Sequence, residues 1–359
     1  SGVRKMTQNI YLPDLCDFPD AGCSIFPETL DFKAHKEHLN HSIDVLDAPK
    51  FKKVHIDLIK RIINTIKLDQ EEIKILQEQI ARIHQTIDVY FNYIINKINR
   101  DDLPETKIYK NLKDEGCSPL ELSEIDIKKL NKILGKEIDY LQNINDHDAK
   151  PHFYDRFLQF KVNDKPELFN ELNNIFNKNQ VFESASKYLG VNRILRLDSI
   201  ALHIATPTDN HHYQTLKDLP TTSKLISLHM DPKFNLVKSI LYLNDVDKDT
   251  GPFTTIPGSN KWIYDKLERL VACGNSTGNY LHTPKHRKVM RMMPKELRKN
   301  VILGRYVLDG TKLSDFLLSQ MHEYTSNECN CIIFDPAQTL HRGGLSNTKN
   351  RINLQILMR

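Results

Sequence analysis

The sequence lacks a long hydrophobic run, and no stretch approaches the about 20 apolar residues that a membrane span needs. Its opening residues, SGVRKMTQNIYLPD, lack the apolar core of a signal peptide, so we expect a soluble cytoplasmic protein. The six cysteines are too few and too scattered for a disulfide scaffold. A strong excess of charge is also lacking. A net +4 over 359 residues gives no electrostatic footprint of a nucleic-acid-binding protein.

The length exceeds that at which one hydrophobic core usually stops growing, so we expect one large domain with an appendage, or two domains. Asp101-Asp102-Leu103-Pro104 is the clearest boundary, because the residue before a proline disfavours helix. We therefore predict an N-terminal part, 1–104, and a main domain, 105–359. The first part begins with 1–50, which is punctuated by Pro and Asp and is expected to be irregular.

Two helices, roughly 52–67 and 70–99, are predicted from apolar residues that recur every three or four positions. The phase slips between them at Asp69, which forms with Glu72 the pattern of a capping box. We expect a helical hairpin in which each helix has one apolar stripe that needs a partner. The stripe either packs against the main domain or forms a coiled-coil-like seam in a homodimer.

Alternation of apolar and polar residues predicts strands in the second half of the chain. Short strands separated by turns are typical of an antiparallel jelly roll of the cupin type. Two amphipathic helices are expected before them, over 123–141 and 166–189, and Gly190 is expected to be the C-cap of the second. The predicted strands cover 193–204, 237–243, 330–335 and a segment beginning at Arg351.

His229 and Asp231 form an H-x-D pair, and His341 follows far downstream. In an extended strand, residues i and i+2 point to the same side, so His229 and Asp231 can reach one metal ion. Two imidazoles and one carboxylate are the ligands of a facial triad, which holds Fe(II) and leaves three positions open. The tripeptide alone is weak evidence, because a His beside a solvated Asp is common.

An ordered set of short motifs accompanies the triad. It comprises Asn244-Asp245-Val246-Asp247, Thr250-Gly251-Pro252-Phe253, Ile256-Pro257-Gly258-Ser259, Ile332-Ile333-Phe334-Asp335, His341-Arg342-Gly343-Gly344, Ser346-Asn347 and Arg351. This set resembles the phytanoyl-CoA dioxygenase family of Fe(II)/2-oxoglutarate oxygenases. Asn260 departs from the family, which usually has His there. A looser match at 111–116 extends the resemblance, which covers roughly 108–359 and is strong after 225.

The resemblance implies an α+β fold, in which a double-stranded β-helix (jelly roll, cupin-like) is braced by helices and carries the N-terminal helical extension. It implies that His229, Asp231 and His341 hold Fe(II). Arg351 would bind the distal carboxylate of the co-substrate 2-oxoglutarate, because its planar fork matches a carboxylate. His203, on the strand 193–204, is a candidate contact to substrate or co-substrate, with an ordinary sheet histidine as the alternative.

The activity implied by the resemblance is a dioxygenase reaction on a small molecule, in which 2-oxoglutarate and O₂ are converted to succinate and CO₂. In halogenase relatives a small residue replaces the carboxylate ligand. The acid at Asp231 therefore favours hydroxylation, or desaturation, over halogenation.

Residues 261–323 are expected to form a long insertion ahead of His341. Within it, the segment 283–300 is strongly basic. It either forms a solvated basic face or holds an anionic group of the substrate, such as a phosphate or carboxylate. The basic residues are Lys285, Arg287, Lys288, Arg291, Lys295, Arg298 and Lys299.

Two alternatives stay open beside the oxygenase. A cupin-like protein can bind a metal or a ligand without activating oxygen, which predicts no stoichiometric 2-oxoglutarate binding and tolerance of Arg351→Ala. A helical interaction scaffold with a relict barrel predicts instead that removal of 1–104 abolishes association while any turnover survives. The sequence does not identify the substrate.

Overall fold

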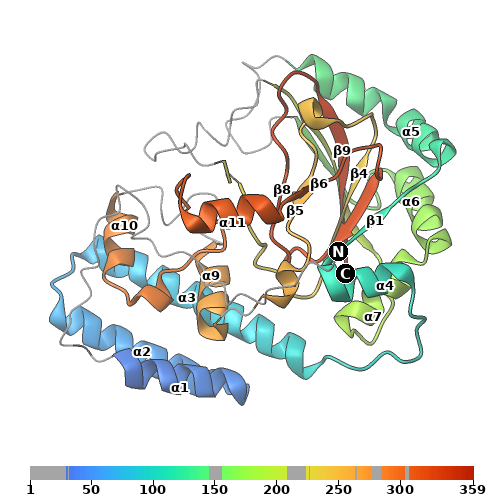
Figure 1. Ribbon diagram of the computed structural model, residues 1–359. Helices are drawn as coiled ribbons and strands as arrows, with labels where there is room; N and C mark the ends of the chain where they lie inside the picture. Colours follow the sequence, from blue (N-terminus) through green and yellow to red (C-terminus); the bar gives the residue numbers. More distant parts are fainter. Residues whose placement is uncertain are drawn as a thin grey trace. The chain divides into compact units, whose positions relative to one another are not determined.

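The computed structural model describes residues 30, 32–144, 156–207, 224, 225, 227–262, 265–276, 284–303 and 307–359 (Figure 1). Its contacts divide the chain into two compact units. Unit 1 comprises Ser1–Ile95, Leu216–Phe234 and Trp262–Ser319. Unit 2 comprises Asn96–Thr215, Asn235–Lys261 and Gln320–Arg359. The domain boundary at residue 104 stays a prediction.

Unit 1 is mainly helical where it is described. The apolar stripe of α3 is buried, and this helix packs against α9. Gly274 in α9 permits the close approach, because a Cβ atom there would lie 2.9 Å from the Cα atom of Ile83. Self-association through the N-terminal helices stays a prediction. The elements are α1 (Phe32–Asp44), α2 (Ala48–Thr65), α3 (Gln70–Ile95), α9 (Lys266–Ser276), α10 (Pro284–Arg291), η4 (Lys295–Leu297) and α11 (Lys312–Gln320).

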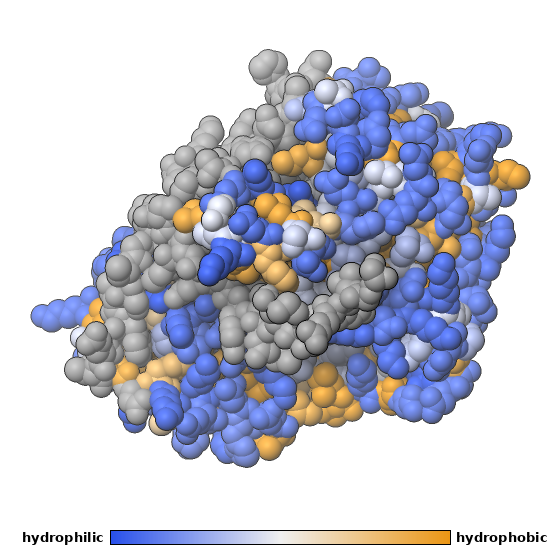
Figure 2. All heavy atoms as spheres, in the orientation of Figure 1, coloured by the Kyte–Doolittle hydropathy of each residue, from blue (hydrophilic) through white to orange (hydrophobic). Residues whose placement is uncertain are grey.

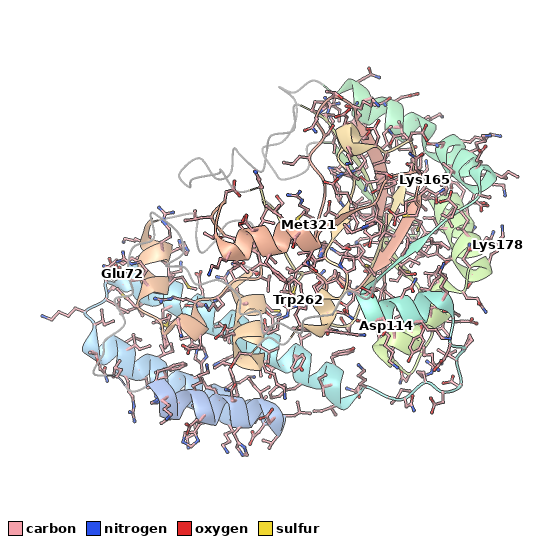
Figure 3. The ribbon with its side chains drawn as sticks, in the orientation of Figure 1. Glu72, Asp114, Lys165, Lys178, Trp262 and Met321 are labelled. Carbon is pink, nitrogen blue, oxygen red and sulfur yellow. The ribbon has the colours of Figure 1, made fainter. Side chains whose placement is uncertain are left out.

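The two helices predicted at 52–67 and 70–99 are present as α2, Ala48–Thr65, and α3, Gln70–Ile95. The predicted capping box is present: the Asp69 N–H donates to Glu72 Oε2 at 3.0 Å, and the Glu72 N–H donates to Asp69 Oδ1 at 2.8 Å. Glu72 lies at the start of α3 (Figure 3). The expected irregularity of 1–50 is wrong for α1, where a segment free of Pro and Gly buries Leu39 and Ile43. The insertion 261–323 contains α9, α10 and α11.

Unit 2 combines helices with two antiparallel sheets, as expected for an α+β fold. The six-stranded sheet has the order β1-β7-β4-β9-β3-β2, and the three-stranded sheet has the order β6-β5-β8. The strands are β1 (Cys117–Leu120), β2 (Phe157–Phe160), β3 (Leu197–Ala205), β4 (Val237–Tyr242), β5 (Thr254–Thr255), β6 (His322–Glu323), β7 (Cys331–Phe334), β8 (His341–Arg342) and β9 (Arg351–Met358). The helical elements are α4 (Lys107–Glu115), α5 (Glu124–Asn143), α6 (Pro166–Lys178), α7 (Val181–Leu189), η2 (Lys248–Thr250) and η3 (Ser259–Lys261).

The two faces of the six-stranded sheet have different partners. Side chains alternate along each strand, so Leu241 and Ile333 join the apolar cluster that contains the buried faces of α4, α5, α6 and α7. Tyr242 and Phe334, one residue further along, join a second cluster with Phe253, which precedes β5. This second face is therefore directed toward the three-stranded sheet. The double-stranded β-helix stays a prediction.

The single helix predicted over 166–189 is wrong, because it is two helices, α6 and α7. The Asn179 side chain donates back to the Ile175 carbonyl at 2.8 Å, which offers the backbone an alternative to continued helix. Gln180 then takes a left-handed conformation, with φ of 56°. The predicted C-cap is confirmed, since Gly190 ends α7 with φ of 67°. The helix predicted over 123–141 is confirmed as α5, which Ser123 caps.

On the face drawn in Figure 2, hydrophilic side chains predominate and hydrophobic ones form small separate patches. Among the helices that the structure describes, none is both long enough and apolar enough to cross a membrane.

A histidine pair, of which His55 is buried, joins α2 to α3. His55 is 1% exposed, and its Nδ1 lies 3.1 Å from Nε2 of His84. Burial, with a smaller effect of His84, lowers the pKa of His55 from 6.5 to about 3. The folded protein therefore holds His55 neutral at pH values where the unfolded chain protonates it.

Acid should for this reason weaken unit 1 through His55. Its contribution to stability is complete above pH 6.5 and is lost as the pH falls toward about 3, at up to about 1.4 kcal/mol per pH unit. His55→Asn keeps a polar atom near the Nδ1 position but does not titrate. Urea unfolding between pH 7 and pH 4 should show a shallower loss of unfolding free energy in the variant, and equal slopes would contradict this role of His55.

Candidate metal centre

The H-x-D segment is held extended by a short pairing with residues 301 and 302. His229 forms an isolated antiparallel bridge with Ile302, and the Met230 N–H donates to the Val301 carbonyl at 3.1 Å. Because the segment is extended, the side chains of His229 and Asp231 point to the same side. His229 Nε2 lies 3.4 Å from Asp231 Oδ1.

A buried polar network fixes the partner segment of this pairing. Asn275, on α9, donates to the carbonyls of Leu297 and Lys299 at 3.3 and 2.8 Å. Its own Oδ1 accepts a hydrogen bond of 3.1 Å from Gln79, on α3. The next residue on α9, Ser276, accepts from the Val301 N–H at 3.2 Å. Two helices therefore support the segment to which His229 and Met230 are paired.

His341 occupies β8, opposite Thr255 of β5. It is 4% exposed, and its ring packs against Phe334 and Phe253, with centroid distances of 4.8 and 6.0 Å. The Leu340 N–H donates to Ser259 Oγ at 2.9 Å, which fixes the backbone just before the histidine.

The turn that leads to His341 is organised by a buried carboxylate. Asp335 accepts hydrogen bonds from the N–H groups of Ala337 and Gln338, at 2.9 and 3.2 Å, and from Tyr188 Oη at 2.8 Å. Burial raises the pKa of the Asp335 carboxyl, and these hydrogen bonds oppose the rise. The turn therefore depends on a buried carboxylate whose oxygens accept hydrogen bonds.

Gly116 lies against the same turn. Thr339 Oγ1 donates to the Gly116 carbonyl at 2.9 Å. A Cβ atom on residue 116 would lie only 2.2 Å from Thr339 Oγ1, and the backbone at residue 116 has φ of 73°. Glycine is needed at this position for both reasons. The loosely matching segment 111–116 thus contacts the turn that precedes His341.

Both histidines are oriented by a carbonyl two residues earlier in the chain. His229 Nδ1 lies 2.6 Å from the Ser227 oxygen, and His341 Nδ1 lies 2.9 Å from the Thr339 oxygen. A carbonyl oxygen can only accept, so each Nδ1 carries the proton. The lone pair of each neutral ring is then on Nε2, which is the arrangement of histidines that bind metals.

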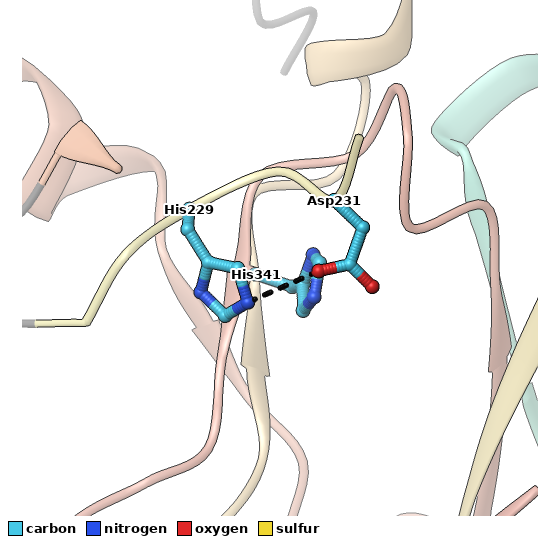
Figure 4. A group of neighbouring side chains, drawn as sticks. All are labelled: His229, Asp231 and His341. Atoms are coloured by element: carbon cyan, nitrogen blue, oxygen red, sulfur yellow. Dashed lines mark ion pairs between the residues drawn. The ribbon is translucent and has the colours of Figure 1, made fainter. Parts of the chain in front are cut away.

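Figure 4 shows His229, Asp231 and His341 together. One potential ligand atom from each lies within 4.8 Å of the others, and no other such group of three or more His, Cys, Asp or Glu occurs among the described residues. Two neutral imidazoles and a carboxylate form a donor set that fits Fe(II) and leaves coordination positions open.

Arg351 begins β9 and is 4% exposed. Its Nε donates to Asn353 Oδ1 at 3.2 Å, and its Nη1 donates to the carbonyls of Gly344, at 3.0 Å, and Gly251. Burial lowers the pKa of this guanidinium. His203, on β3, is half-buried opposite Asn353. Strand alternation puts His203 and Arg351 on the same face, away from the helices.

The basic segment 283–300 is largely engaged within unit 1. Lys285 pairs with Glu71 and, at 3.3 Å, with Asp69, and Lys288 pairs with Glu72. Arg298 and Lys299 are buried. These four side chains are used in ion pairing and packing, and anion binding by the segment stays a prediction.

No protein-family model matches the chain, and no curated protein matches its sequence. Similar solved structures include SnoK, a non-heme alpha ketoglutarate dependent carbocyclase from nogalamycin biosynthesis, at 12% identity and a TM-score of 0.41, over 73% of this chain and 86% of SnoK. EctD from S. alaskensis with bound Fe is 11% identical, with a TM-score of 0.41, over 74% of this chain and 80% of EctD. The epimerase SnoN, in complex with Fe³⁺, alpha ketoglutarate and nogalamycin RO, is 10% identical, with a TM-score of 0.37, over 70% of this chain and 82% of SnoN. At these values the likeness assigns neither a family nor a reaction to this chain.

Asn275→Ala should weaken metal binding although Asn275 contacts no proposed ligand. The change leaves buried partners unsatisfied, which costs about 1–3 kcal/mol of stability, and it loosens the segment paired with His229. We expect roughly tenfold weaker Mn(II) binding by calorimetry, as for other residues that orient ligands.

Asn131→Ala is the matched control, because Asn131 also donates to a backbone carbonyl, that of Leu243, at 2.8 Å. It should cost stability without changing Mn(II) affinity. Wild-type affinity in Asn275→Ala would show that the network does not support the metal ligands.

Proposed function

We propose that this protein is an Fe(II)- and 2-oxoglutarate-dependent dioxygenase of the phytanoyl-CoA dioxygenase-like type, built on a double-stranded β-helix, that hydroxylates a small molecule. The observation that carries the proposal is the grouping of His229, Asp231 and His341, whose ligand atoms lie within 4.8 Å of one another. Desaturation begins in the same way as hydroxylation. Halogenation is disfavoured because Asp231 retains its carboxylate.

The proposed ligands have distinct tasks. His229 and His341 would each present Nε2 to the ion, with the ring held by its Nδ1 hydrogen bond. Asp231 would offset part of the metal charge without filling the coordination sphere. When bound, Fe(II), 2-oxoglutarate and O₂ supply the oxidising power, and succinate and CO₂ are the co-products.

Arg351 is proposed to bind the distal carboxylate of 2-oxoglutarate. Its Nε and Nη1 are engaged by Asn353, Gly251 and Gly344, so the guanidinium plane is already fixed. No described residue accepts a hydrogen bond from Nη2, and this is the nitrogen that we assign to the carboxylate. A guanidinium that is already held in place loses little freedom when the co-substrate binds. His203, on the same face of the sheet, is proposed as a further contact to substrate or co-substrate.

Two observations distinguish the oxygenase from the two alternative functions. A metal-binding protein without oxygen chemistry does not need the fixed arginine on the face shared with His203. A relict barrel beside an independent helical scaffold does not need Gln79 of α3 in the network behind the His229 segment. Both observations favour the oxygenase.

Anaerobic titration with Fe(II) and then 2-oxoglutarate tests the proposal. The wild type should develop the visible charge-transfer band of the chelate, saturating at one equivalent. Arg351→Ala should weaken 2-oxoglutarate binding at least roughly tenfold, because a charge-assisted hydrogen bond is lost. Arg351→Lys keeps the charge but not the fixed guanidinium and should fall between them.

Arg342→Ala is the control, since Arg342 directly follows His341 and is not assigned to the co-substrate. It should bind 2-oxoglutarate like the wild type. Iron that binds without any band in the wild type would contradict the oxygenase and leave a metal-binding jelly roll.

A further inference from the structure

Strand β9 directs a row of polar side chains to one face of the six-stranded sheet. Leu354 and Ile356 belong to the apolar cluster that also contains the buried faces of the helices. Alternation along the strand therefore directs Arg351, Asn353 and Gln355 to the opposite face, which we call the inner face. β9 lies between β4 and β3, away from both edges of the sheet. Gln355 is nevertheless only half-buried, so the inner face is partly open at this position.

The Gln355 carboxamide has no hydrogen-bond partner among the described residues. Ala201 of β3 and Ile240 of β4 lie directly opposite it, and neither side chain has a polar atom. Asn353 differs, because its Oδ1 accepts a hydrogen bond from Arg351 Nε at 3.2 Å. A half-buried carboxamide beside apolar side chains is unfavourable until its oxygen and nitrogen meet hydrogen-bonding partners. Because Gln355 is partly exposed, a ligand can supply those partners.

One end of this row contacts the segment that begins with His341. Arg351 Nη1 donates a hydrogen bond to the Gly344 carbonyl at 3.0 Å, three residues beyond His341. Gln355 follows Arg351 by four residues on the same face, which corresponds to roughly 13 Å of extended strand. The row therefore leads along the inner face from the arginine that we assign to the co-substrate.

The other end of the row also approaches His341. Lys238 of β4 lies opposite both Leu357 of β9 and Phe334 of β7. The Phe334 ring packs against the ring of His341, with a centroid distance of 4.8 Å. Gln355 precedes Leu357 by two residues on the same face. A group bound to Gln355 would thus lie between two places at which the inner face meets the segment of His341.

We propose that Gln355 determines the substrate specificity of the proposed oxygenase by binding a primary carboxamide or a cyclic amide. This inference rests on the proposed function and names its substrate class. Gln355 Oε1 accepts and Nε2 donates, so the side chain can form two parallel hydrogen bonds with a group whose N–H and C=O lie on the same side. An ester has no N–H and can form only one of the two. Ala201 is small and leaves room for such a group beside Gln355.

The test uses the full chain loaded with Mn(II) and saturating 2-oxoglutarate, and two ¹³C-labelled probes, acetamide and methyl acetate. Paramagnetic relaxation of the ¹³C signal reports a probe bound near the metal. The wild type should show saturable relaxation of acetamide, at concentrations several-fold lower than for methyl acetate, because the ester lacks the donor. Gln355→Met keeps the length of the side chain without its hydrogen bonds and should bind acetamide roughly tenfold more weakly.

Two further variants make the outcome specific. Gln159→Met is the matched control, because Gln159 lies on the edge strand β2, opposite Ala201, and is exposed. It should bind acetamide like the wild type. Gln355→Glu has a side chain of the same size that only accepts, so it should gain saturable relaxation of ¹³C-labelled methylammonium, which the wild type does not bind. This gain also decides the result if Gln355→Met does not fold.

Acetamide relaxation that is absent from the wild type, or equal in the wild type and in Gln355→Met, would overturn the inference. So would methyl acetate that saturates the wild type at the same concentration as acetamide, or Gln355→Glu that does not bind methylammonium. Failure of the wild type to bind Mn(II) or 2-oxoglutarate, measured first in the same samples, would instead overturn the proposed function.

Discussion

The pairing of His229 and Met230 with residues 301 and 302 is the contact on which the H-x-D ligands depend. A tripeptide in a loop has no fixed side-chain direction, whereas an extended, hydrogen-bonded one presents residues i and i+2 to one side. The partner segment is held in turn by Asn275 and Ser276 of α9, and Asn275 is held by Gln79 of α3. Helix α3 is therefore part of the support of the candidate metal centre.

The position of His341 depends on a different set of contacts, which likewise fix the direction of its side chain. The Asp335 carboxylate accepts hydrogen bonds within the turn, and Gly116 leaves room for the Thr339 side chain. The Thr339 carbonyl accepts a hydrogen bond from Nδ1 of His341. His229 uses the Ser227 carbonyl in the same way. In both cases the backbone selects the tautomer and the direction of the ring, so the histidine is oriented before an ion arrives.

The features predicted correctly from the sequence are local ones. The Asp69–Glu72 capping box, the helix capped by Ser123 and the Gly190 C-cap each depend on residues a few positions apart. The break at Gln180 was missed because the apolar period runs through it. The Gln79–Asn275 contact was missed because it joins residues far apart in the chain. Its one local signal is a polar residue, Gln79, between Leu76 and Ile83 on an apolar helix face. The candidate metal ligands were predicted from the order of the motifs along the chain. Hydrophobic periodicity does not indicate which His lies close to which Asp.

Counting bound Mn(II) by electron paramagnetic resonance shows whether His229, Asp231 and His341 bind one metal ion. We expect one tightly bound ion per chain, and a roughly hundredfold or greater loss of affinity in each of His229→Ala, Asp231→Ala and His341→Ala, because each removes a ligand. His322→Ala is the control, since His322 pairs with Glu328 at 2.8 Å and belongs to no ligand group among the described residues. Unchanged binding in His341→Ala would mean that these three side chains do not form one metal site.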